Sequence, residues 1–449
     1  MEKKVSFGSK FGTIAVVAGS CIGLGNIWRF PYLAGNNGGS AFIIIYILCS
    51  LTIAIPIMMS EFVIGRSTGK NAFGAFKVLT PKKRWCLVGL FGILTSFFIF
   101  GFYSVVAGWG ISFIQTAFTE GFTGRSPAII HSNFINYINT GWKPTIAALI
   151  FIFLTSSIVI GGIERGIERI NKVLMPMLAF IIIGLFIYST SLPGFKEGMD
   201  FLLKPDFSKI NIGTFLAAIG QSFFSMSLGM GCMVTYGAYI KKETSLPSLA
   251  LTIGVADLSV AILAGFAIFP GVFTFGIEPT SGPTLVFETL PLVFSMMPGG
   301  NIFGIFFFIL VFIAAITSSV SMIEPICLFI IQELKTSRVK AVLIISVFVA
   351  ILSVFCAYSQ VEGSSIRIFG QNLFDFLNNT TDKFMLPFGA LLIIIFVGWF
   401  ANKELVRNQI TNNGHSFNKG FNTYYTFVRF IIPLVLSFFV LNLLGVIKW

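Results

Sequence analysis

Apolar runs long enough to cross a bilayer recur throughout this chain, and they constrain its fold more than any other feature. About twenty consecutive apolar residues span the hydrocarbon core of a membrane. Backbone N–H and C=O groups must be satisfied within each segment there, so such runs predict helices. We therefore expect an all-α integral membrane protein with eleven transmembrane helices. These lie near residues 11–33, 40–64, 87–118, 145–161, 170–190, 211–239, 247–275, 301–331, 339–358, 373–400 and 423–447.

Little of the chain remains for a soluble domain. Its residues are 55% hydrophobic and 11% charged, with a mean hydropathy of +0.89, as is typical of polytopic membrane proteins. The widest connections, such as 119–144, have room for only one or two short surface helices. We therefore treat residues 1–449 as a single transmembrane domain and expect its chemistry to lie within the bundle.

The basic residues are distributed unevenly between the two sides of the membrane. Of the 30 Lys and Arg residues, 8 belong to one side, and Arg29 and Arg429 lie in or at the ends of apolar runs. The other 20 belong to the N-terminus and to every second loop after it: 65–86, 162–172, 240–246, 332–340 and 401–420. The positive-inside rule then predicts a multi-pass protein of the inner (plasma) membrane with a cytoplasmic N-terminus and an external C-terminus. The net charge of +12 is a topology signal, and no nucleic-acid partner is expected.

The sequence lacks the motifs of several other protein classes. It contains no His-Glu-x-x-His and no Gly-x-Ser-x-Gly, and His131 and His415 fall in loops, so we do not expect an enzyme. The first run lacks a signal-peptide cleavage site and is interpreted as a retained helix. A disulfide framework is not expected, because every cysteine lies in or beside an apolar run: Cys21, Cys49, Cys86, Cys232, Cys327 and Cys356.

Two of the apolar runs contain dense small and polar residues at mid-depth. They are AGSCIGLGN (18–26) in the first run and SFFSMSLGMG (222–231) in the sixth. Close helix packing, for example of Gly19 and Gly23, is one explanation. However, the two interruptions lie five spans apart in corresponding positions, which is typical of transporters with inverted repeats and a midplane site.

An interrupted helix in hydrocarbon requires something to satisfy its freed backbone groups, each of which costs several kcal/mol if left bare. Freed carbonyls coordinate small cations, and half-helix N-termini face carboxylates. Glycine allows a ligand to approach the main chain closely. We therefore interpret Gly19, Gly23 and Gly25 as part of an opened stretch that holds an ion and an anionic group.

Six stretches carry a more specific signal when taken together. They are GLGNIWRFPYLAGNNGGSAF (23–42), EFVIGR (61–66), IERGIERINKVLMP (163–176), GQSFFSMSLGMGCMVTYGAY (220–239), ITSSVSMIEP (316–325) and LPFGALLIIIFVGW (386–399). The chain, from about Lys4 to its C-terminus, resembles the neurotransmitter:sodium symporter family with the leucine-transporter fold. The resemblance implies two inverted five-helix repeats, 8–190 and 211–401, with the first and sixth helices broken. An eleventh helix would occupy 421–447, as in a bacterial eleven-span member.

The resemblance also implies two sodium sites. The first would use the carbonyl of Cys21, the side chains of Asn26 and Asp257, the carbonyl and hydroxyl of Ser225, and the substrate carboxylate. The second would use the carbonyls of Gly19, Ile22 and Ala314 and the hydroxyls of Thr317 and Ser318. Unwound carbonyls and adjacent hydroxyls are hard oxygen donors that suit such a cation. In the alternative interpretation, Thr317 and Ser318 bond back to their own helix.

The same resemblance implies a pocket for an L-amino acid. Tyr103 would bind its carboxylate and Phe224 would cap it from outside, while Met230 and Met322 can repack around apolar groups or serve as ordinary core residues. The expected substrate-binding residues are Ser20, Cys21, Gly23, Gly25, Tyr103, Phe224, Ser225, Ser227, Met230, Ser318 and Met322.

Two gates are expected on either side of this pocket. Arg29 is costly in lipid, and the family's external gate suggests Asp375 as its partner; the alternative is an Arg29 that snorkels to the outer interface. On the inner side, Lys4 and Gln332 replace a common arginine and its acidic partner. The inner gate would then rely on Glu333 or be looser.

Asp257 stands where the family typically has a neutral asparagine. It would lie near Tyr46 and Gln221, part of the chloride site in animal members, while Ala261 replaces a serine of that site. A fixed carboxylate balances the charge of sodium as chloride does elsewhere, so we expect chloride-independent transport. A capped or helix-bonded aspartate without an ionic role is the alternative.

Taken together, the sequence predicts a sodium-coupled symporter that imports L-amino acids, apolar or aromatic in side chain, by alternating access. The alternatives are sodium-dependent transport of another small amine or amino acid, an ion channel, and a non-transporting receptor of the same fold.

Overall fold

The structure is a computed structural model that describes residues 6–276, 286–443 and 445–446. It is built almost wholly of helices, some of which contain π-helical or 3-10 stretches that are labelled η. The first half contains α1 (Lys10–Cys21), η1 (Gly25–Arg29), α2 (Phe30–Asn36), α3 (Ser40–Cys49), η2 (Ser50–Ala54), α4 (Ile55–Thr68), α5 (Ala72–Leu79), α6 (Cys86–Thr119), α7 (Pro127–Asn139), α8 (Trp142–Ile160), η3 (Ile163–Glu168), α9 (Arg169–Ser189), α10 (Phe195–Leu203) and η4 (Phe207–Lys209).

The second half continues the same pattern, with one short antiparallel strand pair before its last two long helices. It contains α11 (Ile212–Ser225), α12 (Cys232–Tyr239), α13 (Leu246–Thr274), α14 (Thr289–Met296), α15 (Gly300–Glu333), α16 (Arg338–Ser359), β1 (Arg367–Ile368), β2 (Gln371–Asn372), α17 (Leu373–Thr380), η6 (Thr381–Met385), α18 (Leu386–Ile395), η7 (Phe396–Phe400), α19 (Lys403–Ile410), α20 (Phe421–Thr426), η8 (Phe427–Ile431) and α21 (Ile432–Leu443).

Within the described residues, nine continuous helical segments are long and apolar enough to cross a membrane, and α1 with η1–α2 forms a tenth, bent span. The nine are Ser40–Thr68, Cys86–Thr119, Trp142–Ile160, Ile163–Ser189, Leu246–Thr274, Gly300–Glu333, Arg338–Ser359, Leu373–Phe400 and Phe421–Leu443. The predicted sixth span, 211–239, divides into α11 and α12, each too short to cross alone. The all-α membrane fold is therefore confirmed, while the count of eleven stays a prediction. The predicted last span reaches residues 444 and 447, which lie outside the described part of the chain.

Both predicted interruptions are breaks in the helices. The chain turns by 49° between α1 and η1–α2, around residues 22–24. The second break separates α11 from α12, where Ser227, Gly229 and Gly231 have φ angles of 51°, 76° and 78°. Glycine adopts this left-handed region without strain, whereas serine does so at a cost, so Ser227 needs compensating contacts.

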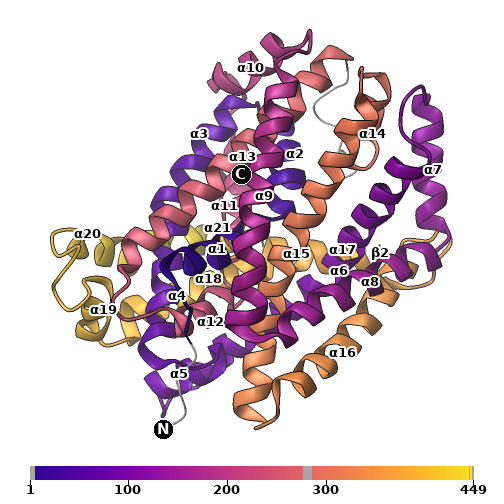
Figure 1. Cartoon of the computed structure of the whole chain (residues 1–449). Coiled ribbons are helices and arrows are strands. Elements are labelled where there is room, and N and C mark those ends of the chain that lie inside the picture. Colours follow the sequence, from indigo (N-terminus) through magenta and orange to yellow (C-terminus); the bar gives the residue numbers. More distant parts are fainter. Residues whose placement is uncertain (1–5, 277–285, 444, 447–449) are drawn as a thin grey trace.

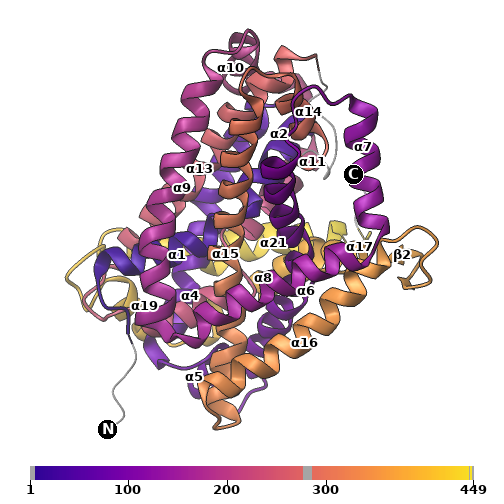
Figure 2. The same ribbon diagram turned by 45° about the vertical axis from the view of Figure 1, so that its right-hand side comes forward.

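The bundle has well-buried central helices, α6 and α15 among them, and a less buried periphery. In their most apolar 18-residue windows, 72% of α15, 67% of Ser40–Thr68 and 61% of α6 are buried, against 28% of Ile163–Ser189 and of Phe421–Leu443. Figures 1 and 2 show α10 and α14 at one end of the molecule and α5 at the other, with α7 outside the main bundle. The breaks in α1–α2 and α11–α12 face the central helices.

Helices α4 and α12 touch through their backbones. A Cβ atom on Gly65 would lie 1.9 Å from the carbonyl oxygen of Val234, and one on Gly237 would lie 2.9 Å from that of Phe62. No side chain larger than hydrogen fits at either position. The EFVIGR stretch therefore fixes the second half of the broken span against α4.

Candidate functional site

The two breaks meet in the interior and are joined by hydrogen bonds. The Ser227 hydroxyl donates to the carbonyl oxygen of Ser20 at 2.8 Å, and the Gln221 amide donates to that of Gly25 at 2.8 Å. Within the first break, the Asn26 carbonyl oxygen Oδ1 accepts from the backbone N–H of Gly23 at 3.0 Å. These side chains compensate the freed backbone groups, including the strained turn at Ser227.

Asp257, on α13, is the centre of a buried polar cluster. Its Oδ1 accepts from the Asn26 amide at 2.8 Å and the Ser225 hydroxyl at 2.7 Å, and its Oδ2 accepts from the Tyr46 hydroxyl at 3.1 Å. None of these residues is more than 2% exposed. Asp257 thus joins α3, both broken spans and α13 through one carboxylate, whose charge is held by three donors.

A second group of oxygen atoms lies where α15 faces the first break. The Ser318 hydroxyl donates to the carbonyl oxygens of Gly19 and Ile22 at 3.2 and 3.4 Å. Thr317 bonds instead to its own helix, donating to Ile313 at 3.0 Å and to the Ala314 carbonyl at 3.1 Å. The alternative interpretation of these hydroxyls therefore describes Thr317 but not Ser318.

These oxygen atoms are chemically suited to an alkali cation. They are carbonyl, hydroxyl and carboxylate donors, which hard cations prefer to nitrogen or sulfur. Clusters of three or more His, Cys, Asp or Glu side chains that could hold a metal ion are not found among the described residues. The donors fit the two predicted sodium sites in kind, and Cys21 lines the cavity beside them.

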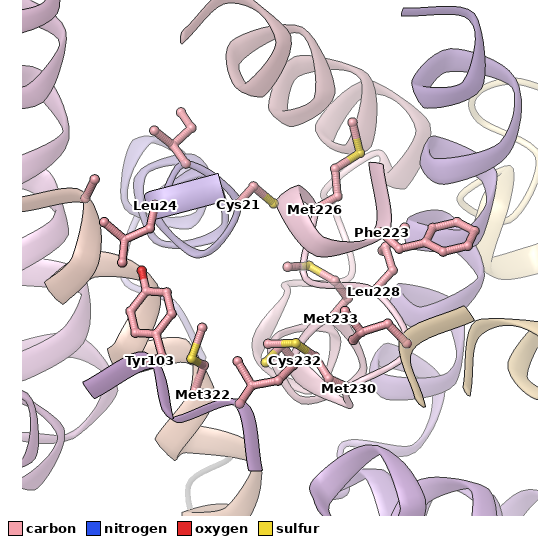
Figure 3. Close-up of a cluster of buried hydrophobic side chains, with 14 of the residues drawn as sticks. Cys21, Leu24, Tyr103, Phe223, Met226, Leu228, Met230, Cys232, Met233 and Met322 are labelled. Carbon is pink, nitrogen blue, oxygen red and sulfur yellow. The ribbon is translucent and has the colours of Figure 1, made fainter. Parts of the chain in front are cut away.

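A narrow cavity lies between the breaks, α6 and α15, with about 10 Å³ open to the centre of a water-sized sphere. All eleven predicted substrate-binding residues line it, together with Leu24 and Ile99. Figure 3 shows the Tyr103 oxygen directed toward Leu24, with Met322 beside the ring. Leu24 lies between two predicted lining glycines and Ile99 one helical turn before Tyr103, so spacing alone could have identified both.

Two hydroxyl groups in this cavity have no hydrogen-bond partner among the described residues. They belong to Tyr103 and Ser20, and both are buried. An unpaired buried hydroxyl is costly, at about 1–3 kcal/mol. Their position on the lining of the cavity indicates that a bound polar group would satisfy them.

The two glycines of the first break are required by the space around them. A Cβ on Gly23 would lie 2.3 Å from the Ser318 hydroxyl oxygen and 3.4 Å from that of Tyr103. A Cβ on Gly25 would lie 3.1 Å from the Phe224 ring. The backbone therefore lies against the cavity at both glycines, with the least room at Gly23.

The outer closure of the cavity differs from the predicted gate. Arg29 pairs with Asp382 at 2.5 Å, and its guanidinium lies over the Phe224 ring at 5.1 Å from the centroid. Asp375 instead accepts from the Asn372 side chain at 2.7 Å at the start of α17. The prediction of Asp375 was wrong because the two aspartates lie seven residues, about two helical turns, apart on one helix face. The deeper one reaches Arg29.

The inner side has a different arrangement. Lys4 lies outside the described residues, while Gln332 and Glu333 both accept from the Asn71 side chain, at 2.9 and 3.0 Å. Among the ion pairs of the described residues, none contains Glu333. Gln332 and Glu333 therefore lie together and share the neutral side-chain amide of Asn71. An inner gate that relies on Glu333 stays a prediction.

A charged network that the sequence analysis missed lies nearby. The Glu324 carboxylate accepts from the Tyr239 hydroxyl at 2.7 Å and pairs with Arg338 at 2.7 and 2.8 Å. Phe7, fully buried, packs edge-on against the rings of Tyr236 and Tyr239. These contacts join Phe7, α12, α15 and the start of α16. The signal in the sequence was the acid in ITSSVSMIEP, a charge within an apolar run.

The residues of the expected anion site bond in different ways. Tyr46 donates its hydroxyl to the Asp257 carboxylate at 3.1 Å, Gln221 donates to the Gly25 carbonyl at 2.8 Å, and Ala261 is buried on the same helix as Asp257. Beside Tyr46, the Ser50 and Ser222 hydroxyls share a hydrogen bond at 3.1 Å. The carboxylate therefore occupies the Tyr46 donor.

Comparison with known proteins adds an independent line of evidence. A model of the sodium:neurotransmitter symporter family matches residues 4–127 and 126–448. The chain is 36% identical over 448 residues to the sodium-dependent transporter YhdH of Bacillus subtilis, with 100% of this chain and 99% of the relative covered. It is 36% identical over 454 residues to a sodium-dependent transporter of Haemophilus influenzae, with 98% and 99% covered.

A solved structure is similar over nearly the whole fold. The crystal structure of MhsT in complex with L-phenylalanine aligns with a TM-score of 0.91 and 36% sequence identity, covering 98% of this chain and 100% of MhsT. Similarity in both sequence and structure thus extends across the bundle, both breaks included.

Proposed function

The chain belongs to the sodium:neurotransmitter symporter family, and from that premise we propose that it imports apolar or aromatic L-amino acids by sodium-coupled alternating access. The family resemblance stated from the sequence is confirmed. Relatives are named as sodium-dependent transporters, and MhsT was crystallised with L-phenylalanine. These names support the ion and the substrate class proposed for this chain.

The observation that carries the proposal is an apolar cavity with an unpaired phenol at its edge. The Tyr103 hydroxyl offers a donor for a carboxylate at the edge of the cavity. Phe224, Met230 and Met322 line the rest and offer nothing to pair a charged side chain. Because burying an unpaired charge is expensive, the pocket favours zwitterions with apolar side chains.

Two sodium ions are proposed as co-substrates. The cluster of Asn26, Ser225 and Asp257 would hold one, next to the substrate carboxylate, and the group formed by Ser318 with the Gly19 and Ile22 carbonyls would hold the other. The Thr317 hydroxyl would join the second after rotating away from its own helix. Substrate and ions share the same two breaks, which couples their binding.

The closed cavity favours a transporter over a channel. Arg29, Asp382 and Phe224 cover it on one side, and the backbone bond from Phe7 to Tyr239, at 3.1 Å, ties the other side closed. A channel requires a continuous path, whereas alternating access requires that the two closures open in turn. We propose two inverted five-helix repeats around this site, and a protein of the inner membrane with its N-terminus in the cytoplasm.

Chloride independence is the finer part of the proposal. Asp257 supplies a fixed negative charge within hydrogen-bond distance of Asn26 and Ser225. That charge offsets a sodium ion at the same cluster, so no external anion is needed.

Uptake into proteoliposomes tests these statements. Radiolabelled phenylalanine should accumulate when sodium is imposed outside, and leucine, tyrosine and tryptophan should compete more strongly than glutamate, lysine or glycine. Stronger competition by glutamate or lysine would refute the substrate class. Sodium flux without a fixed ratio to amino-acid flux would favour a channel.

A further inference from the structure

Arg429 is a cation on the lipid-facing periphery that the transport site does not use. It lies on η8, and its guanidinium carbon is 4.6 Å from the centroid of the Trp399 ring and 5.4 Å from that of Phe430. Both rings are 53% exposed, and the segment Phe421–Leu443 is mostly unburied. The two rings pack edge-on against each other with centroids 5.6 Å apart, and the guanidinium lies beside both of these exposed aromatic side chains.

The local backbone is shaped to bring these groups together. Two π-helical stretches, η7 and η8, meet here, and π-helical turns are frequent at functional sites. A Cβ on Gly398 would lie 2.9 Å from the Cα of Arg429, so glycine permits the close crossing. The Trp399 indole donates to the Arg429 carbonyl at 2.9 Å, and the Tyr425 hydroxyl donates to that of Gly398 at 3.2 Å.

The charge of Arg429 is uncompensated within the part of the chain that the structure describes. Its Nε is buried without a hydrogen-bond partner, and no ion pair there includes it. Two more cations lie over neighbouring rings, Lys83 over Phe400 and Lys403 over Tyr425. An arginine in hydrocarbon is expensive unless it reaches the interface and finds an anion. Because the described residues supply no anion to Arg429, its counter-ion has to come from outside them.

We propose that Arg429, Trp399 and Phe430 bind the phosphate headgroup of an anionic phospholipid. Guanidinium forms bidentate hydrogen bonds with phosphate oxygens, and tryptophan is favoured at the level of lipid headgroups. The site lies at the end of the bundle that carries the basic loops 65–86 and 401–420, which is the cytoplasmic leaflet in the proposed orientation. It is separate from the cavity and does not rest on the proposed transport function.

Native mass spectrometry of the full chain, incubated with equal amounts of phosphatidylglycerol and phosphatidylcholine, tests the site. The wild type should retain phosphatidylglycerol about fivefold more than phosphatidylcholine, the ratio expected from about 1 kcal/mol per basic residue at an anionic surface. Arg429→Gln should reduce the ratio to near one, whereas the control Arg84→Gln, an exposed cation of the same side, should leave it unchanged. Added inorganic phosphate should not displace the lipid.

Three results would overturn the proposal. They are equal retention of both lipids by the wild type, an unchanged ratio in Arg429→Gln, and displacement by inorganic phosphate alone, which would indicate a soluble-anion site. If Arg429→Gln does not fold, Trp399→Leu decides, since it keeps the charge and removes one ring. It should lower the ratio at least twofold, and an unchanged ratio would count against the site.

Discussion

The Asn26 side chain donates to both the carboxylate and the backbone carbonyl of Asp257, at 2.8 and 3.1 Å. One amide therefore connects the broken first span to the middle of α13. Its own carbonyl oxygen accepts from the Gly23 N–H, so Asn26 links the Asp257 cluster to a glycine that lines the cavity. This connection is the physical basis for the coupling expected below.

Uptake should depend on sodium. A tenfold gradient supplies ~1.4 kcal/mol per ion, and 100 mV supplies ~2.3 kcal/mol per charge, so two ions provide about 7 kcal/mol. We expect steep accumulation of phenylalanine with external sodium and loss of uptake in potassium or choline buffer. Undiminished uptake without sodium would contradict the proposal.

Asp257→Asn should make transport sensitive to chloride. Replacing chloride by gluconate should leave wild-type uptake unchanged, because the carboxylate already balances the sodium charge. In Asp257→Asn the same replacement should lower uptake about tenfold, the equivalent of ~1.4 kcal/mol of lost charge balance. Asp206→Asn, at an exposed aspartate, is the control. A strong chloride requirement in the wild type would show that Asp257 does not serve this role.

Removing either partner of the outer ion pair should slow transport. Arg29→Gln and Asp382→Asn should each reduce uptake about tenfold at normal expression, because each leaves a mostly buried charge without its partner. Asp375→Asn is the matched control and should transport normally, since Asp375 is exposed and its carboxylate accepts from Asn372, at the end of β2, rather than from Arg29. Normal uptake in both gate variants, measured in proteoliposomes, would exclude this ion pair as the gate.

Tyr103→Phe should weaken substrate binding without unfolding the protein. A hydrogen bond to a charged group contributes about 1.5–3 kcal/mol, so the dissociation constant for phenylalanine should rise by about 10- to 100-fold. Tyr137→Phe is the control, because it removes a hydroxyl on the outer helix α7 that bonds to Ser112 on α6. Equal affinities in scintillation proximity binding assays would mean that Tyr103 does not contact the substrate.

Gly23→Ala should abolish uptake. Its Cβ would lie 2.3 Å from the Ser318 hydroxyl oxygen. The Ser318 side chain or the backbone would have to move, which would disturb both the cavity and the proposed second ion site. Gly184→Ala provides a matched control, because a Cβ there meets nothing within 4 Å among the described residues. If the Gly23 variant retained near-normal uptake and sodium affinity, the close approach of this backbone would not be required.

The sequence allowed the helical spans and the two breaks to be predicted, since bilayer thickness and backbone hydrogen bonding leave few alternatives. Small and polar residues, which are costly in lipid, also marked the two broken spans whose residues line the cavity. The position of a residue along its helix was harder to predict. Asp375 and Asp382 share one helix face, and only the packed structure selects the one that reaches Arg29. The Glu324–Arg338 pair likewise joins two spans that spacing within the chain does not relate.

The glycine contact between α4 and α12 has a mechanical consequence. Gly65 and Gly237 bring the two backbones together without intervening side chains. We therefore expect α4 and α12 to move as one rigid unit. The first half of the other broken span, α1, is held differently. It packs against α9, α13 and α15, and its Gly12 and Gly19 face the side chains of Glu168 and Asn171 rather than another backbone. One broken span is thus anchored by direct backbone contact and the other through side chains.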